Sequence, residues 1–175
     1  MGSKELPDIL APGLRVLFIG YNPGLRSAEI GHHYAGKSNL FWDILFRSGL
    51  TPEKLDYTRD WELLRYQYGS TNIIDRPSKS AMDLTREEYL EGKQILRELL
   101  IEYKPYIACY VGIGVYKAFS GRRKVNWGRQ AEKTVEGIVD FVAPSTSGLN
   151  RMPATEQVEI YSKLKGLLQE IKRFN

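Results

Sequence analysis

The chain has 175 residues, of which 42% are apolar, enough to bury the core of one domain or at most two small ones. Its only cysteine, Cys109, lies in an apolar run, which excludes an internal disulfide and any zinc or iron–sulfur site built from several cysteines. The formal net charge of +4 is too small to identify a nucleic-acid-binding protein by itself. No apolar run reaches the length of a membrane span, and the use of cysteine is typical of a reducing, intracellular compartment.

The first strong local signal is a compact apolar run over residues 14–19, which predicts a buried strand. Gly20-Tyr21-Asn22-Pro23-Gly24 follows and ends that strand abruptly, because it contains two glycines and a proline. In an open α/β sheet, ligands bind at the loops that leave the carboxyl ends of the strands. The pattern therefore predicts that Asn22 stands at the rim of a cleft, with a simple strand-ending turn as the alternative.

Periodicity and capping signals predict the remaining elements. The first half of the chain has a polar and aromatic loop over 25–37, a helix over 40–49 capped by Ser38, a short helix within 56–68 and a strand over 71–74. A helix follows, opened by the capping box Thr85-Arg86-Glu87-Glu88. The rest of the chain has a strand over 106–111, a helix over 112–118, a strand over 137–142 and a last helix over 154–174. This alternation predicts an α/β fold, a single three-layer α/β/α domain over residues 1–175 with its core at about 10–174 and a short, mainly parallel central sheet.

A basic stretch follows the helix over 112–118. Between Lys117 and Lys133 the acidic Glu132 is outnumbered by basic residues, with Arg122, Arg123 and Lys124 at its centre. A stripe of this kind is the electrostatic footprint of a polyanion-binding surface. A solvated loop is the alternative.

Several motifs in the chain together resemble one family. They are Gly20-Tyr21-Asn22-Pro23-Gly24, Gly31-His32-His33-Tyr34-Ala35-Gly36, Asn39-Leu40-Phe41-Trp42, Ser48-Gly49-Leu50, Thr71-Asn72-Ile73-Ile74-Asp75-Arg76, Trp127-Gly128 and Ala143-Pro144-Ser145-Thr146-Ser147-Gly148-Leu149-Asn150-Arg151. In this order and spacing they resemble the mismatch-specific uracil/thymine-DNA glycosylase branch of the uracil-DNA glycosylase superfamily. The sequence departs from that pattern at Tyr21, where an aliphatic residue is usual, and at Lys37-Ser38, which replaces a pair containing proline.

The resemblance implies an enzyme of base-excision repair. Such a glycosylase flips uracil or thymine mispaired with guanine out of double-stranded DNA and hydrolyses the N-glycosidic bond, leaving an abasic site for a separate endonuclease. It implies a monomer without cofactor or metal, in the cytoplasm or nucleoid of a prokaryote or the nucleus of a eukaryote. Two alternatives are a catalytically weak or inactive mismatch-sensing DNA-binding module and a small-molecule α/β enzyme with a nucleotide ligand.

The resemblance also assigns roles to single residues around the base. Asn22 positions the attacking water, and His33 contacts the water or the sugar. The base pocket is assigned to Tyr21 through its backbone N–H, Ser27 near the thymine methyl group, Tyr34 as a stacking ring, Asn39, and Asn72 at the pyrimidine edge. The alternatives are purely structural roles, namely a surface-loop histidine at His33, loop packing at Tyr34, a helix cap at Asn39 and a backbone-bonded asparagine at Asn72.

The loop over residues 143–151 is assigned to the DNA. Gly24, Ser145, Thr146 and Ser147 face phosphate, while Gly148, Leu149, Asn150 and Arg151 form a wedge loop. Leu149 fills the gap that the flipped base leaves, and Arg151 steadies the wedge and the opposite strand. A core position for Leu149 is the alternative. Asp75 and Arg76 are expected to form a salt bridge or to anchor a loop.

Overall fold

A five-stranded sheet forms the centre of the computed structural model, which describes residues 6–174. The strands are β1 (Val16–Gly20), β2 (Tyr68–Asn72), β3 (Ile107–Val111), β4 (Gly128–Arg129) and β5 (Val139–Ala143), and their order across the sheet is β2-β1-β3-β5-β4. β2, β1, β3 and β5 run parallel, whereas β4 pairs antiparallel with β5 at the edge. The carboxyl ends of four strands therefore meet at one edge of the sheet.

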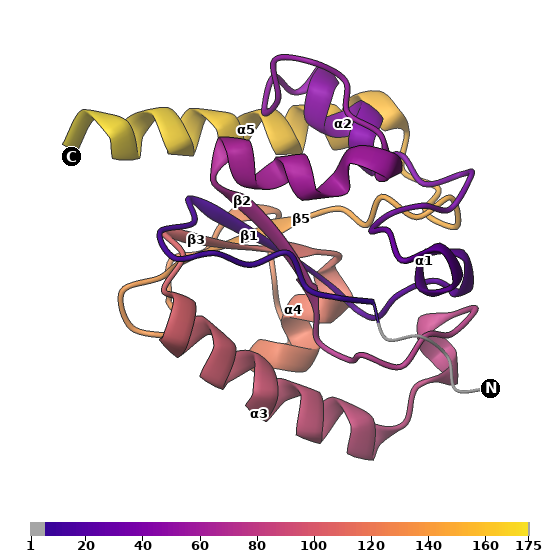
Figure 1. Ribbon diagram of the computed structural model, residues 1–175. Helices are drawn as coiled ribbons and strands as arrows, with labels where there is room; N and C mark the ends of the chain where they lie inside the picture. The colour runs from indigo at the N-terminus through magenta and orange to yellow at the C-terminus, as the bar shows by residue number, and fades with distance from the viewer. Residues whose placement is uncertain (1–5, 175) are drawn as a thin grey trace.

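Helices cover both faces of this sheet (Figure 1). They are α1 (Leu25–Ile30), α2 (Phe41–Arg47), the 3₁₀ helices η1 (Tyr57–Tyr66) and η2 (Ala81–Asp83), α3 (Arg86–Tyr103), α4 (Ile113–Ser120) and α5 (Ala154–Phe174). In Figure 1, α2 and α5 lie above the sheet, and α3 and α4 lie below it. The predicted α/β/α architecture with a mainly parallel sheet is confirmed. None of the helices within residues 6–174 carries an apolar stretch long enough to cross a bilayer.

Alternating side chains of β1 divide the core into two layers. Val16 and Phe18 pack into the cluster with α2 and α5, and Leu17 and Ile19 pack into the cluster with α3 and α4. All five residues of β1 are buried, because a central parallel strand is covered on both faces. Cys109 of β3 is also buried, and burial raises the pKa of its thiol, as expected of a core residue.

The observed elements differ from the predicted ones at α1, β2 and β4, and the short η2 was not predicted either. The segment 25–37, predicted as a loop, begins with α1, and β2 starts at Tyr68 rather than at residue 71. Gly69 weakens the strand signal, yet a Cβ there would lie 2.5 Å from the carbonyl oxygen of Ile9, so tertiary packing requires the glycine. The short β4 lies inside the predicted basic loop, and pairing with β5 rather than a local pattern creates it.

Two helix caps were predicted, and one is confirmed. Thr85 Oγ1 accepts from the backbone N–H of Glu88 at 3.2 Å, and Glu88 Oε2 accepts from the N–H of Thr85 at 2.7 Å, a complete capping box. The prediction that Ser38 caps α2 is wrong. Asn39 Oδ1 instead accepts from the N–H of Phe41 at 2.9 Å, because an asparagine side chain readily bonds the backbone two residues ahead of it.

Candidate active site

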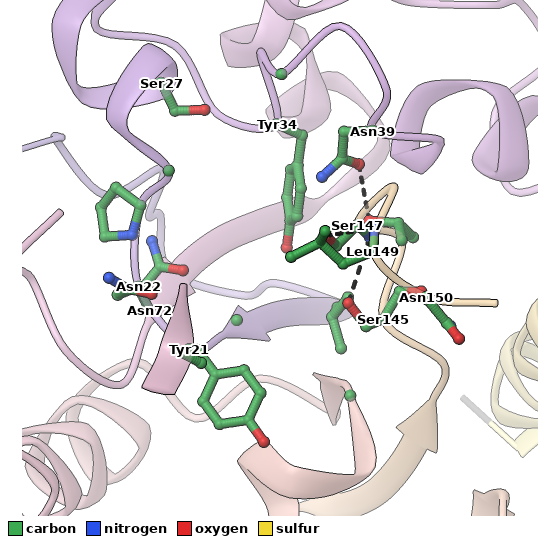
Figure 2. Close-up of a pocket in the computed structure, with 18 of the residues that line it drawn as sticks. Tyr21, Asn22, Ser27, Tyr34, Asn39, Asn72, Ser145, Ser147, Leu149 and Asn150 are labelled. Carbon is green, nitrogen blue, oxygen red and sulfur yellow. Dashed lines mark hydrogen bonds between the residues drawn. The ribbon is translucent and has the colours of Figure 1, made fainter. Parts of the chain in front are cut away.

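A cleft of about 670 Å³ opens at the carboxyl edge of the sheet, where β1, β2 and β3 end and the loop after β5 begins. Figure 2 shows Asn22 and Asn72 on one side of this cleft and Ser145, Ser147 and Leu149 on the other, with Tyr34 between them. The cleft contains almost every residue assigned to the base pocket and the DNA loop. These are Tyr21, Asn22, Gly24, Ser27, His33, Tyr34, Asn39, Asn72, Ser145, Thr146, Ser147, Gly148, Leu149 and Asn150.

Asn22 is held by two hydrogen bonds from its amide nitrogen. Nδ2 donates to the carbonyl oxygen of Arg76 at 2.8 Å and to Ser78 Oγ at 2.7 Å. An amide has only two N–H donors, so both are engaged inside the protein. The side-chain oxygen Oδ1 has no hydrogen bond among the described residues and is the atom left for a ligand.

Ser78 is the residue that sequence reasoning missed. It is buried, it lines the cleft, and its hydroxyl donates to the carbonyl oxygen of Ser80 at 2.7 Å while it accepts from Asn22. Its backbone N–H also bonds the carbonyl oxygen of Pro23 at 3.2 Å, which joins the loop after β2 to the loop after β1. No local pattern marks a serine after Pro77, because Asn22 and Pro23, its partners in the loop after β1, lie more than fifty residues away in the chain.

His33 is bonded on both ring nitrogens. Nε2 lies 2.6 Å from the carbonyl oxygen of Pro7, and Nδ1 lies 2.8 Å from Ser70 Oγ. A carbonyl only accepts, so Nε2 carries the hydrogen and Nδ1 accepts from the Ser70 hydroxyl. The side chain is 3% exposed, and burial lowers the pKa of the imidazole below its ordinary 6.5. The geometry thus favours a positioning role for His33 over the contact with water or sugar that the resemblance implies.

Tyr34 lies at the bottom of the cleft in a strained backbone conformation, with φ +53°. One face of its ring is stacked on Phe41, with the ring centroids 3.7 Å apart and the planes 10° from parallel. Trp42 Nε1 donates to its carbonyl oxygen at 3.2 Å. The fixed ring therefore offers its other face to the cleft, as a stacking platform requires.

Asn72 ends β2 beside Gly20. A Cβ on Gly20 would lie 2.7 Å from Asn72 Oδ1 and 3.8 Å from the Tyr34 hydroxyl, so only glycine leaves this part of the floor open. Among the described residues, no hydrogen bond involves the Asn72 side chain. The backbone-bonded alternative for Asn72 therefore has no support, and its amide can offer a donor and an acceptor to a ligand.

Ser27 lies on α1 and is buried in the wall of the cleft. Its hydroxyl oxygen accepts from the backbone N–H of Ala35 at 3.0 Å, which fixes the side chain and closes the segment between α1 and Tyr34.

Asn39 combines the two roles that the sequence left open. Its Oδ1 accepts both the N–H of Phe41, the first residue of α2, and, at 2.8 Å, the Thr146 hydroxyl, so this oxygen ties the loop after β5 to the start of that helix. Its Nδ2 makes no hydrogen bond within residues 6–174 and lines the cleft. The bond to the start of α2 and the contact with the pocket thus use different atoms of the Asn39 amide.

The loop after β5 holds Leu149 in solvent. Leu149 is 78% exposed, and its N–H donates to Ser147 Oγ at 3.2 Å. Asn150 Nδ2 donates to the carbonyl oxygen of Ser145 at 2.8 Å, which closes the loop beneath it. Ser145 and Ser147 accept from backbone N–H groups through their hydroxyl oxygens, so their hydroxyl hydrogens remain available to a phosphate.

Tyr21 turns away from the base floor toward α4. A Cβ on Gly114 would lie 1.5 Å from the Tyr21 hydroxyl oxygen, so the ring covers the first turn of α4 (Figure 2). The ring also meets Tyr89 edge-on at 6.3 Å, and burial raises the pKa of its hydroxyl to about 12. The side chain thus packs against the fold, and the role of the Tyr21 backbone N–H at the base stays a prediction.

The three central basic residues of the predicted loop lie outside the cleft, although Trp127 of the same stretch lines it, and one of the three is engaged internally. Arg122 donates to the Tyr116 hydroxyl at 2.6 Å and pairs with Glu132 at 2.9 Å, whereas Arg123 and Lys124 are exposed. Arg151 is exposed on the wedge loop but does not line the cleft.

Below the cleft, Arg76 forms the ion pair expected of it. Its Nη2 lies 3.0 Å from Glu88 Oε2. The described cleft residues include no carboxylate and one lysine, Lys79. The chemistry available here is hydrogen bonding by amides, hydroxyls and backbone groups rather than proton abstraction by an acid side chain.

Comparison with known proteins agrees with this geometry. A family model described as the uracil DNA glycosylase superfamily matches residues 7–165. The fold is similar to the solution NMR structure of a candidate uracil DNA glycosylase from Methanosarcina acetivorans, with a TM-score of 0.62 and 18% sequence identity, over 93% of this chain and 98% of that one. Identity at this level shows a common fold. Because the family match runs from before β1 into α5, the chain belongs to the uracil DNA glycosylase superfamily.

Proposed function

We propose that the protein is a monofunctional DNA glycosylase that removes uracil or thymine mispaired with guanine and leaves an abasic site. Membership of the superfamily implies glycosylase activity in base-excision repair, and the preference for mispairs is the finer part of the proposal. The observation that carries the glycosylase proposal is the Asn22 amide. Its two hydrogens are bonded inside the protein, which leaves Oδ1 free to bind a ligand, and the described residues of the cleft include no carboxylate.

In the proposed reaction, the bond between the sugar C1′ and the base N1 breaks, and its electron pair leaves with the pyrimidine. Water adds to C1′ as the sugar becomes cation-like. Asn22 Oδ1 accepts a hydrogen bond from that water and directs the water's oxygen at C1′. An amide is a poor base, so the proton of the water passes to solvent or to the departed base after the C–O bond forms, and we expect slow turnover.

Recognition of the flipped base would use the two groups that remain unpaired at the floor. The Asn72 amide can donate to one carbonyl oxygen of the base and accept from N3–H, and the open face of Tyr34 can stack on its ring. Exposed Leu149 would enter the duplex in place of the flipped base. A base opposite guanine is easier to extrude than one in a Watson–Crick pair, which favours G·U and G·T sites.

Both alternative functions have observations against them. A pure mismatch-sensing module has no need for an amide oxygen held in place by two bonds, as Asn22 is. A nucleotide-binding enzyme would place phosphates at the start of α4, where the Tyr21 ring covers Gly114. Duplex DNA and a downstream abasic-site endonuclease are the partners that we propose.

The test uses labelled G·U, G·T, A·U and A·T duplexes and a uracil-containing single strand, with enzyme in excess, and detects alkali-labile sites. We expect wild type to cleave G·U fastest, and Asn22→Ala to lose at least about 100-fold in rate, as enzymes do when one electrostatic contact to the reacting centre is removed. Binding to a G·U duplex should change by only a few-fold. Equal losses of binding and rate would remove Asn22 from the water, and a wild type inactive on every substrate would reject the function.

A further inference from the structure

Among the described residues that line the cleft, Lys79 is the only lysine or arginine, and no carboxylate accompanies it. The side chain is exposed, and no ion pair involves it within residues 6–174. A cleft that carries charge of one sign concentrates ligands of the opposite sign. The ammonium group of Lys79 therefore marks this part of the cleft as a site for an anionic oxygen.

The backbone of Lys79 is fixed to the loop that carries Asn22. On one side of Lys79, Ser78 Oγ accepts from Asn22 Nδ2 at 2.7 Å, and the Ser78 N–H donates to the carbonyl oxygen of Pro23 at 3.2 Å. On the other side, Ser80 forms the capping box at the start of η2. Lys79 and Asn22 therefore belong to one hydrogen-bonded unit, so an anion bound by Lys79 is held on the Asn22 side of the cleft.

The opposite side of the cleft offers hydroxyl groups to a second anion. Figure 2 shows Ser145 and Ser147 across the cleft from Asn22, and their hydroxyl oxygens accept from backbone N–H groups, which leaves the hydroxyl hydrogens available. A nucleotide within a DNA strand has one phosphate on each side of its sugar. A strand that delivers a base to the floor of the cleft can therefore bring one phosphate to the serines and the other to Lys79.

We propose that Lys79 binds the DNA phosphate next to the flipped nucleotide on the Asn22 side of the cleft. This inference rests on the proposed function, because it names how the same cleft holds the strand that carries the flipped base. Since the unit that holds this phosphate also fixes Asn22, phosphate binding positions the sugar C1′ against Asn22 Oδ1. Arg123 and Lys124 lie outside the cleft and meet any duplex, whereas Lys79 acts only when a nucleotide has entered the cleft.

The experiment measures the affinity of wild type and Lys79→Gln for a duplex with a stable abasic-site analogue opposite guanine, and for a fully matched duplex. We expect Lys79→Gln to bind the abasic duplex about tenfold more weakly and with a salt slope reduced by about 1, because it loses one charge-assisted contact to phosphate. Affinity for the matched duplex should stay within about twofold of wild type, because no nucleotide of that duplex enters the cleft.

A second arm identifies the phosphate. The linkages on either side of the abasic-site analogue are replaced, one at a time, by an uncharged methylphosphonate. At one linkage wild type should lose about tenfold in affinity and Lys79→Gln should lose nothing further, because removing either partner of one contact removes the whole contact. Unchanged binding of the abasic duplex by Lys79→Gln, or losses that add at both linkages, would overturn the proposal.

Lys104→Gln is the matched control, since Lys104 is also exposed but lies between α3 and β3, at the edge of the sheet opposite the cleft. It should bind both duplexes as wild type does. Slower release of uracil by Lys79→Gln with unchanged affinity for the abasic duplex would assign the lysine to the departing base and would also overturn the proposal. A wild type that binds the abasic duplex but releases no base would reject the proposed function instead, so the two failures are distinct.

Discussion

At the scale of single residues, Ser27 is the position where the proposed thymine activity can be tested. Its hydroxyl is fixed on the N–H of Ala35, so the space that it leaves for a methyl group is set by its small size. Ser27→Thr keeps the hydroxyl and adds one methyl group. We expect G·T activity to fall about 10-fold or more while G·U activity stays within about threefold. The reason is that one methyl group that fits poorly in a close pocket lowers the rate by a factor of about 10 or more.

Single-turnover rates on G·U and G·T duplexes measure this ratio. Ser27→Ala serves as the control, since it loses the bond to Ala35 without adding bulk and should lower stability rather than change the ratio. Equal losses on both substrates in Ser27→Thr would show that the residue does not face the methyl group.

His33 makes a prediction about stability and pH. The unfolded chain binds a proton on this imidazole near the ordinary pKa of 6.5, whereas burial lowers the pKa in the folded protein. The unfolded state therefore binds more protons below pH 6.5. The contribution of His33 to the unfolding free energy should be complete above that pH and fall by about 1.4 kcal/mol per pH unit below it, until the lowered pKa is reached.

Urea denaturation of wild type and His33→Gln between pH 8 and pH 4.5 isolates this component. The difference between their unfolding free energies should be constant above pH 6.5 and shrink below it. Parallel curves across the whole range would mean that His33 titrates alike in the folded and unfolded states, which would contradict the effect of its burial.

At the scale of elements, the loop after β5 is a rigid support for one exposed side chain. Its own hydrogen bonds and the tie between Thr146 and Asn39 hold Leu149 outside the core. Leu149→Ala should lower the rate on a G·U duplex about 10-fold or more and leave the uracil-containing single strand nearly unaffected, because a single strand has no gap to fill.

The comparison of duplex with single strand is the measurement, and Leu25→Ala is the control. Leu25 is also exposed, at 56%, but lies on α1 and does not line the cleft, so its variant should behave as wild type on both substrates. If Leu149→Ala slows both substrates alike, the leucine supports the loop rather than the duplex.

At the scale of the whole molecule, the site lies where the chain changes direction across the sheet. After β1 the chain adds β2 on one side, and then returns to add β3 on the other side of β1. Crevices form at such switch points in parallel sheets, because the loops from neighbouring strands diverge there. On one side of this crevice, the loops after β1 and β2 are joined by the hydrogen bond between Asn22 and Ser78, although the two loops are distant in the chain.

The exposed basic side chains should affect how the whole molecule binds DNA. Exposed Arg123 and Lys124 can each neutralise a phosphate, whereas Arg122 is bonded to Tyr116 and Glu132. Replacing Arg123 and Lys124 with Gln should weaken binding to matched and mismatched duplexes alike and reduce the slope of log K against log[salt] by about 1 per lost contact. Arg122→Gln, the control, should lower the melting temperature and keep the slope. An unchanged slope in the double variant would place this loop outside the interface.

The sequence by itself determined the features that depend on neighbours in the chain. The apolar run of β1, the glycines and proline after it, the capping box at Thr85 and the period of α5 are all local signals, and each appears where it was predicted. The polar composition of the loop after β5 likewise indicated that Leu149 is exposed. Such signals survive because a residue's backbone preference and the period of a helix or strand need no distant partner.

Only the tertiary structure decided which side chains are bonded to which. Ser78 holds Asn22, Ser70 binds His33, and Arg122 folds onto Tyr116, each through a contact whose partner no local pattern marks. The start of β2 and the existence of β4 depend on pairing with neighbouring strands, and not on propensity. A hydrogen bond needs its two atoms within about 3 Å, and only the packed chain brings residues from different loops that close.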